Sequence, residues 1–366
     1  MARLLALAIL CCAAYASAQT QDRENQWDLL VAAAKGEGKV VLLGPPDAQV
    51  RQELSAAFKA RFGVTVEYLG SRSSETAARL RVERAAGLYT VDVVFAGSDT
   101  LAGVYYPEKM LAPLKPALIL PDALDPAKWK RGKPWFTDPE ERYVLRLFNT
   151  VGPAFYINTR SVKPDELGAA RDLLDPRWKG RISAHDPTVG GSGVGHATRF
   201  YLQFGEDYVR RLYVDQKPAV ARDRRQLTDW LLRGSYPISL DAEEDQVERL
   251  RREGLPIKAV YKLSDMAGTL SAGVGQMALF DHAPHPNAAR VFANWMASKE
   301  GLEIYARARG EAPTRNDIDA AAFLPAEIIP QTGAEYFDMH AWESAVVERR
   351  KVQALMKEML KSRGND

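Results

Sequence analysis

Thiol chemistry is nearly absent from this chain of 366 residues. Its two cysteines, Cys11 and Cys12, lie side by side in an apolar N-terminal stretch. If that stretch is removed, no thiol is left in the rest of the chain. A disulfide, a cysteine nucleophile and a cysteine-ligated zinc site are then excluded from the mature protein, which is indifferent to redox conditions.

An excess of charge of one sign is also missing. The chain has 49 Lys+Arg against 47 Asp+Glu, which gives a formal net charge of +2. So small and evenly spread a charge does not predict nucleic acid or an anionic membrane as a partner. Any electrostatic function must therefore be local.

The apolar N-terminal run is too short for a membrane span. Residues 4–15 give about 12 apolar positions, whereas a bilayer core needs about 20. The run follows Arg3 and precedes Ala16-Ser17-Ala18, which is the order of a secretory signal peptide. We expect residues 1–18 to be removed on export and the mature protein to be periplasmic.

Hydrophobic periodicity predicts alternating helices and strands. Helical stripes occur at 27–34, 50–62 and 75–85, and strand-like runs at 39–43, 65–69 and 91–96. This βαβ alternation predicts a parallel sheet. A second series begins near Gly152, with strands at 154–158, 181–184 and 237–240 and a helix at 195–204. Because one core rarely organises more than about 300 residues, we expect two packed units.

Several segments together resemble family 1 extracellular solute-binding proteins, the periplasmic ligand receptors of ABC importers. They are residues 27–43 (WDLLVAAAKGEGKVVLL), 152–159 (GPAFYINT), 270–275 (LSAGVG), 285–289 (HPNAA) and 294–301 (NWMASKEG). The resemblance implies an α/β fold of the two-lobed periplasmic binding protein type II class, with a hinged cleft between the lobes. It also implies two partners, a small-molecule solute and the importer's membrane permease.

The same resemblance implies a division of the chain. We expect lobe 1 to contain residues 19–151 plus 270–314, and lobe 2 to contain 152–269 plus 315–366. Hinge crossings are expected near 152–158, 269–273 and 313–316. The protein is expected to be a monomer that needs no cofactor and is not an enzyme.

Two loops that follow predicted strands favour an anion. Ser71, Arg72 and Ser73 precede a helix and would present hydroxyls, a guanidinium and backbone N–H groups at its positive end. A serine there could equally cap the helix, and Arg72 could be a solvated cation. Ser98, after the strand at 91–96, is a further candidate ligand contact.

The loop at 185–195 is the sharper signal. Thr188 and Ser192 supply hydroxyls, and Gly191 and Gly193 permit close backbone approach to an anionic group. The segment lacks the Lys-Ser/Thr of a Walker A loop and departs from the Gly-x-Ser-x-Gly motif. The alternative interpretation is a flexible glycine-rich turn.

A carboxylate cluster follows the strand at 237–240. Asp241 and Glu243 could bind a cation or an amine, or they could belong to the first turn of a solvated helix. Ferric-iron binders of this family carry an adjacent tyrosine pair near this position. Here the only such pair is Tyr105-Tyr106, in another segment, so no metal site is predicted.

Two further motifs allow more than one interpretation. His282 and His285 lie close to Asp281, but prolines at 284 and 286 break the helix that would align them, so we expect an ordinary loop. Tyr156, in the strand at 154–158, is a candidate ligand contact that could instead belong to the core.

The sequence therefore predicts a receptor that captures a small anionic or zwitterionic organic solute in a cleft between lobes. One alternative is a ferric-iron-binding protein that uses a synergistic anion. A second is a secreted hydrolase, which would need a nucleophile, a base and an orienting group within hydrogen-bond reach. The five histidines are not attached to a recognisable nucleophile motif.

Overall fold

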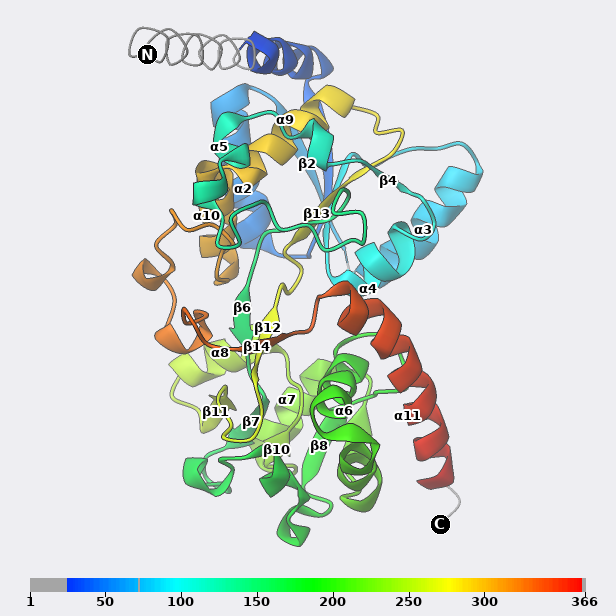
Figure 1. Ribbon diagram of the computed structural model, residues 1–366, viewed down its shortest axis with the longest axis vertical. Coiled ribbons are helices and arrows are strands. Elements are labelled where there is room, and N and C mark those ends of the chain that lie inside the picture. Colours follow the sequence, from blue (N-terminus) through cyan, green and yellow to red (C-terminus); the bar gives the residue numbers. More distant parts are fainter. Residues whose placement is uncertain (1–24, 72, 364–366) are drawn as a thin grey trace, which may run out of the picture. The chain divides into compact units, whose positions relative to one another are not determined.

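The computed structural model describes residues 25–71 and 73–363. The predicted signal peptide and Arg72 lie outside the described residues. The chain divides into two compact units (Figure 1). The first contains the chain up to Asn149 together with Ala272–Leu324, and the second contains Thr150–Ser271 together with the chain from Pro325 onward.

The first unit is built on a sheet of six strands. A helix covers residues 25–37, and the elements that follow it are β1 (Lys39–Gly44), α2 (Ala48–Phe62), β2 (Thr65–Gly70), α3 (Ser73–Ala85), β3 (Val93–Ala96), α4 (Ser98–Thr100), η1 (Leu101–Tyr105), β4 (Leu111–Ala112), η2 (Lys115–Ala117), α5 (Pro121–Leu124), η3 (Pro126–Lys128), β5 (Leu145–Arg146), β13 (Gln276–Phe280), α9 (Pro286–Ala297), α10 (Lys299–Arg309) and η8 (Ala320–Ala322). The strand order is β2-β1-β3-β13-β4, with β5 also paired to β13.

Side chains of this first sheet alternate between two cores. Val40 and Leu42 of β1 face the core made with α2, α9 and α10, whereas Val41 and Leu43 face the core made with α3 and η1. Strands β1, β2 and β3 are parallel, as the alternation predicted, but β13 runs antiparallel to β3. The direction of β13 depends on a pairing partner about 180 residues away, which periodicity does not reveal.

The second unit has a five-stranded sheet and a small three-stranded one. Its elements are β6 (Thr150–Gly152), β7 (Phe155–Asn158), η4 (Pro164–Glu166), η5 (Ala170–Leu174), η6 (Pro176–Trp178), β8 (Ile182–His185), α6 (Ser192–Arg210), η7 (Arg211–Asp215), β9 (Ala219–Ala221), α7 (Arg224–Arg233), β10 (Ile238–Ser239), α8 (Glu244–Arg252), β11 (Ile257–Val260), β12 (Gly268–Ser271), η9 (Ala326–Ile328), β14 (Tyr336–Asp338), η10 (Glu343–Glu348) and α11 (Arg349–Arg363). The orders are β11-β7-β10-β8-β9 and β14-β12-β6.

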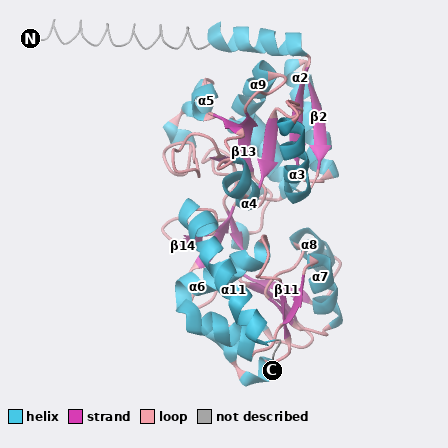
Figure 2. Cartoon of the chain, turned by 90° about the vertical axis from the view of Figure 1, so that its right-hand side faces the viewer, coloured by secondary structure: helices cyan, strands magenta, loops and turns pink. Residues whose placement is uncertain are grey.

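Helices cover both faces of the five-stranded sheet (Figure 2). Phe155 and Ile157 of β7 point into the core shared with α6 and α11. Tyr156, between them, points into the core shared with α7 and α8. Both units are thus three-layered α/β structures, and the predicted fold class is confirmed.

The chain passes between the units after Asn149, Ser271 and Leu324. The first two positions lie beside the expected crossings, but the structure keeps residues 315–324 in the first unit. The reason is Arg315, which is fully buried there and donates to the carbonyls of Asp122 (3.0 Å) and Ala297 (2.8 Å). Within residues 25–71 and 73–363, no helix has the length and apolar character needed to cross a bilayer.

Candidate functional site

Two parallel strands of the second unit bring most of the predicted site residues together. Ser183 of β8 is in register with Ser239 of β10, and their hydroxyls are 2.9 Å apart. Because the strands are parallel, their carboxyl ends share one edge of the sheet, where open α/β folds bind ligands. His185 at the end of β8 and Asp241 after β10 therefore approach to 3.9 Å (Nδ1 to Oδ2).

Thr188 is held by its own loop. Its backbone N–H and its hydroxyl both donate to Asp186 Oδ1, at 2.9 and 2.6 Å, and Arg222 Nε donates to Asp186 Oδ2 at 2.9 Å. Burial opposes ionisation of Asp186, but these hydrogen bonds outweigh it and lower the pKa of the carboxyl. The donors that the sequence assigned to a ligand are thus used to shape the loop.

His185 anchors the start of α6. Gly193 N donates to His185 Nδ1 at 3.0 Å, and the Ser192 hydroxyl lies 3.2 Å from the same nitrogen. A nitrogen that accepts a backbone N–H carries no proton, so the proton is on Nε2, which faces the carbonyl oxygen of Arg222 at 3.3 Å. Gly193 also has no room for a side chain, because a Cβ would lie 2.5 Å from the His185 carbonyl oxygen.

Asp241 is a buried carboxylate with a cationic partner. Its exposed fraction is 2%, and Arg224 Nε donates to its Oδ1 at 3.1 Å. Burial alone would raise the pKa of Asp241, but the positive charge of Arg224 and the groups around it lower it instead. His196, whose Nε2 is 3.9 Å from Oδ1, is neutral because burial lowers its pKa to about 3.

Glu243 lies at the edge of this cluster. Its carboxylate is 3.9 Å from Arg224, and its side chain is 39% exposed. Its backbone N–H is not free to donate to a ligand because it donates to the Thr228 hydroxyl at 3.0 Å. Of the two carboxylates, that of Glu243 is therefore the more accessible, whereas that of Asp241 is buried.

Ser192, His185 and Asp241 are the residue types of a hydrolytic triad, but their geometry differs from one. In a triad the serine and the carboxylate bind opposite nitrogens of the imidazole. Here both lie on the Nδ1 side, and the lone pair of Nδ1 already accepts the Gly193 N–H. Nε2 faces a carbonyl oxygen, so the histidine is not arranged as a base for Ser192.

Two donors at the start of α6 remain open. The backbone N–H groups of Gly190 and Gly191 have no hydrogen-bond partner among the residues that the structure describes. Gly190 is exposed, and Gly191 adopts a φ of 124°, which favours glycine. These groups lie at the N-terminal end of α6, which is the positive end of the helix dipole, where an anion is stabilised.

The first unit places its candidates at the carboxyl ends of β2 and β3. Ser71 N donates to the Gly44 carbonyl at 3.0 Å, and the Ser71 hydroxyl accepts from Thr76 at 2.6 Å. Nothing is described for the Ser73 side chain. Ser98 is 2% exposed and accepts from Gln276 Nε2 at 2.6 Å. Ser98 is thus buried at the start of α4, which does not suit the ligand contact expected of it.

The tyrosine and histidine candidates contact other groups of the protein. Tyr156 is 3% exposed and packs in the core with α7 and α8, so its placement favours the core interpretation. His285 N and Nδ1 both lie within hydrogen-bond distance of the buried Asp92 carboxylate. His282 stacks on Tyr89. The segment is therefore a loop that connects β13 to α9.

No metal centre is evident where the structure is described. Residues 25–71 and 73–363 contain no group of three or more His, Cys, Asp or Glu side chains placed to hold an ion. Tyr105 is fully buried against Phe280, and the Tyr106 hydroxyl donates to Glu140 at 2.8 Å. Burial raises the pKa of both tyrosines to about 12.

Two residues of this cluster, His185 and Arg224, were not predicted from the sequence as parts of a site. Arg224 is one of three arginines at 222–225, around Asp223, a pattern typical of a solvated helix start. His185 is the first residue of the loop at 185–195, but its type and position alone do not assign it a contact. Strand order is the signal that was missing, because only the pairing of β8 with β10 brings Asp241 beside them.

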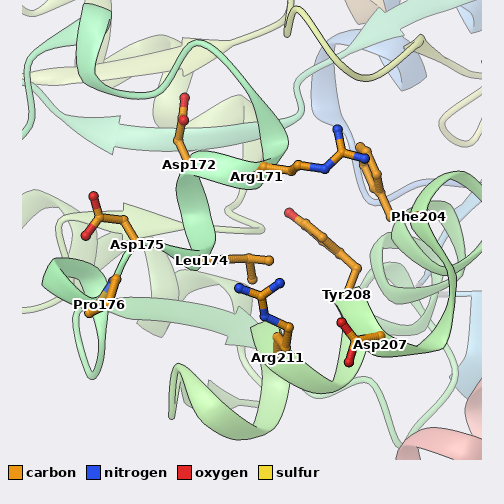
Figure 3. A pocket seen from close by; sticks show the side chains of 9 residues that line it. All are labelled: Arg171, Asp172, Leu174, Asp175, Pro176, Phe204, Asp207, Tyr208 and Arg211. Atoms are coloured by element: carbon orange, nitrogen blue, oxygen red, sulfur yellow. The ribbon is translucent and has the colours of Figure 1, made fainter.

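A pocket of about 630 Å³ occupies another part of the second unit, between η5 and the second half of α6 (Figure 3). Its charged groups have partners nearby. Arg171 pairs with Asp265 at 3.3 Å, Asp207 accepts from Arg210 at 2.6 Å, and Asp175 accepts from the backbone of Arg177 at 3.0 Å. None of the predicted site residues lines it, so we do not place the solute there.

Solved structures share this fold. They include iron-bound HitA from Pseudomonas aeruginosa (TM-score 0.62, 15% identity), the periplasmic binding protein AfuA from Actinobacillus pleuropneumoniae with fructose-6-phosphate (0.66, 17%) and Trichodesmium IdiA (FutA) with iron and citrate (0.65, 16%). Each match covers 88% of this chain and 99% of the other. The fold is that of the periplasmic binding proteins.

Comparison at the level of sequence points to the same class of protein. Residues 53–329 match the family described as "Bacterial extracellular solute-binding protein", and the chain belongs to that family. It is also 23% identical over 289 residues to an uncharacterised protein of Haemophilus influenzae, covering 74% of this chain and 76% of that protein. The family resemblance that the sequence predicted is therefore confirmed.

Proposed function

We propose that this protein is the periplasmic receptor of an ABC importer and captures a small anionic or zwitterionic organic solute for the membrane permease. Family membership supports a binding role. The expected signal peptide supports export. The histidine geometry around Ser192 gives no support to the hydrolase alternative.

One observation carries the choice of solute. Gly190 is exposed, Gly191 is half-buried, and the N–H groups of both lack partners among the described residues, at the positive start of α6. Fixed backbone donors bind an anionic group with little reorganisation. Glu243, the accessible carboxylate after β10, would then receive an ammonium group if the solute is zwitterionic.

Ferric iron with a synergistic anion is the second candidate. Two of the similar structures, HitA and IdiA, hold iron, whereas AfuA holds fructose-6-phosphate. The adjacent tyrosine pair of this chain is engaged within the first unit, because Tyr105 is buried and the Tyr106 hydroxyl donates to Glu140. The organic solute is therefore the better-supported proposal.

A thermal-shift screen of the purified mature protein tests the proposal. The panel contains sugar phosphates, dicarboxylates, amino acids, phosphonates and ferric citrate, with neutral sugars as the matched control. A solute at 100 times its dissociation constant should stabilise the folded state by about 2.7 kcal/mol, or roughly 5 to 10 °C for units of this size.

Two results would contradict the proposal. One is stabilisation by neutral sugars alone, which would remove the anion-binding role of α6. The other is turnover of ester or phosphate substrates that Ser192→Ala abolishes, which would restore the hydrolase alternative.

A further inference from the structure

One fully buried arginine connects α6 to the segments by which the chain enters and leaves the second unit. Arg199 is 0% exposed. Its guanidinium donates to the Pro153 carbonyl at 3.1 Å, to the Ala154 carbonyl at 2.7 Å and to the Thr269 hydroxyl at 3.3 Å. A single side chain thus binds two separate segments.

The position of the acceptors is informative. Pro153 and Ala154 join β6 to β7, shortly after the chain enters the second unit at Thr150. Thr269 lies in β12, which pairs with β6 through Gly152 and leaves the unit after Ser271. We call β6, β12 and residues 153–154 the crossing strands. The hydrogen bonds of Arg199 connect these strands to α6.

Stability alone does not account for an arginine at this position. Burial lowers the pKa of Arg199 to about 10, so the side chain remains charged at neutral pH. Its three acceptors are uncharged. An apolar side chain of similar volume would avoid the desolvation of a buried charge. What the guanidinium adds is a rigid fork of donors aimed in several directions.

The other end of the same helix face holds the candidate loop. Ser192, His196 and Arg199 are spaced i, i+4 and i+7, so they lie along one side of α6. Ser192 contacts His185, and His196 lies beside Asp241. A displacement of the loop at 186–191 would therefore move the helix segment that carries Arg199.

We propose that Arg199 is a positioning residue that transmits changes in the loop at 186–191 to the crossing strands. The inference rests on the proposed function in one respect, because a receptor that rearranges around a solute would use these strands as its hinges. The coupling itself is a property of the second unit and can be measured without a solute.

The test is a double-mutant cycle read by hydrogen exchange of the full mature chain. Gly191→Ala disturbs the loop, because an alanine disfavours the φ of 124° found there. In the wild-type background we expect amide exchange in peptides covering 150–158 and 266–271 to rise at least threefold. In the Arg199→Met background, Gly191→Ala should leave that exchange unchanged.

Two further variants separate coupling from simple destabilisation. Arg199→Lys keeps the charge but replaces the two donor nitrogens by one, so it should restore part of the response. Thr269→Val removes one acceptor with little change in shape, and it should weaken the response even if Arg199→Met does not fold. Strand β1 of the first unit is the internal control and should not respond.

The proposal is overturned if Gly191→Ala changes exchange in the crossing strands equally with and without Arg199. It is also overturned if Gly191→Ala has no effect on them in the wild-type background. Either result leaves the receptor function intact if the solute screen succeeds. Conversely, a complete response with no stabilising solute would contradict only the proposed function.

Discussion

Gly193 offers the sharpest test of how α6 meets β8. A Cβ at this position would lie 2.5 Å from the His185 carbonyl oxygen and 2.7 Å from that of Asp186. Both obstacles are backbone atoms, so no side chain can rotate away. Gly193→Ala must therefore push the first turn of α6 off the strand end by nearly 1 Å to reach ordinary contact distance.

The cost can be worked out from the contacts that this shift breaks. Overpacking at a tight site costs about 1 to 3 kcal/mol. The shift would also break the 3.0 Å hydrogen bond from Gly193 N to His185 Nδ1, which is worth about 1 kcal/mol. We expect Gly193→Ala to lower the unfolding free energy of the second unit by roughly 2 to 4 kcal/mol.

Gly190→Ala is the matched control. A Cβ there meets nothing within 4 Å, and its φ is not in the left-handed region, so its effect should stay within about 0.5 kcal/mol. Guanidinium unfolding followed by circular dichroism measures both variants. If Gly193→Ala is as stable as Gly190→Ala, the close approach of α6 to β8 is refuted.

Three other outcomes are expected. Asp241→Asn should reduce the loss of unfolding free energy below about pH 4. The reason is that a carboxyl whose pKa is lowered in the folded state stabilises the protein above its unfolded pKa and loses that contribution as the pH falls. Urea unfolding from pH 3 to 7 checks this. Protein loaded with ferric citrate should stay colourless, since Tyr105 and Tyr106 are engaged elsewhere; a stoichiometric visible charge-transfer band would count against it. By calorimetry with any solute found in the screen, Ser192→Ala should weaken binding about 10- to 150-fold and His285→Ala little, whereas the reverse order would move the site to the other loop.

The fold was predictable because its signals are local. Helical stripes and buried apolar runs identified β1, α2, β2, α3 and β3 close to their observed bounds. The antiparallel directions of β13 and β7 were not predictable, because each is decided by a partner remote in sequence. Periodicity reports which faces are buried and is silent on which strands become neighbours.

The candidate site was predictable in location but not in chemistry. The loop before α6 does lie at the carboxyl edge of the sheet beside Asp241. The donors of Thr188 and Gly193 are nevertheless used within the protein. Sequence shows which groups can donate, but the three-dimensional partners decide which donors are free. Arg199 could not have been found at all, since its acceptors are two backbone carbonyls and one hydroxyl from other segments.

The threefold passage of the chain between units has a consequence for biosynthesis. The second unit needs Val352, Met356 and Met359 of α11 to complete its core, although its first strand begins at Thr150. The core of the first unit likewise needs residues of β13, α9 and α10. Neither unit can finish folding while the ribosome is still adding these segments, and closing such distant contacts is slow. The first unit can therefore complete its core only after α10 has been made, and the second only after nearly the whole chain has been made.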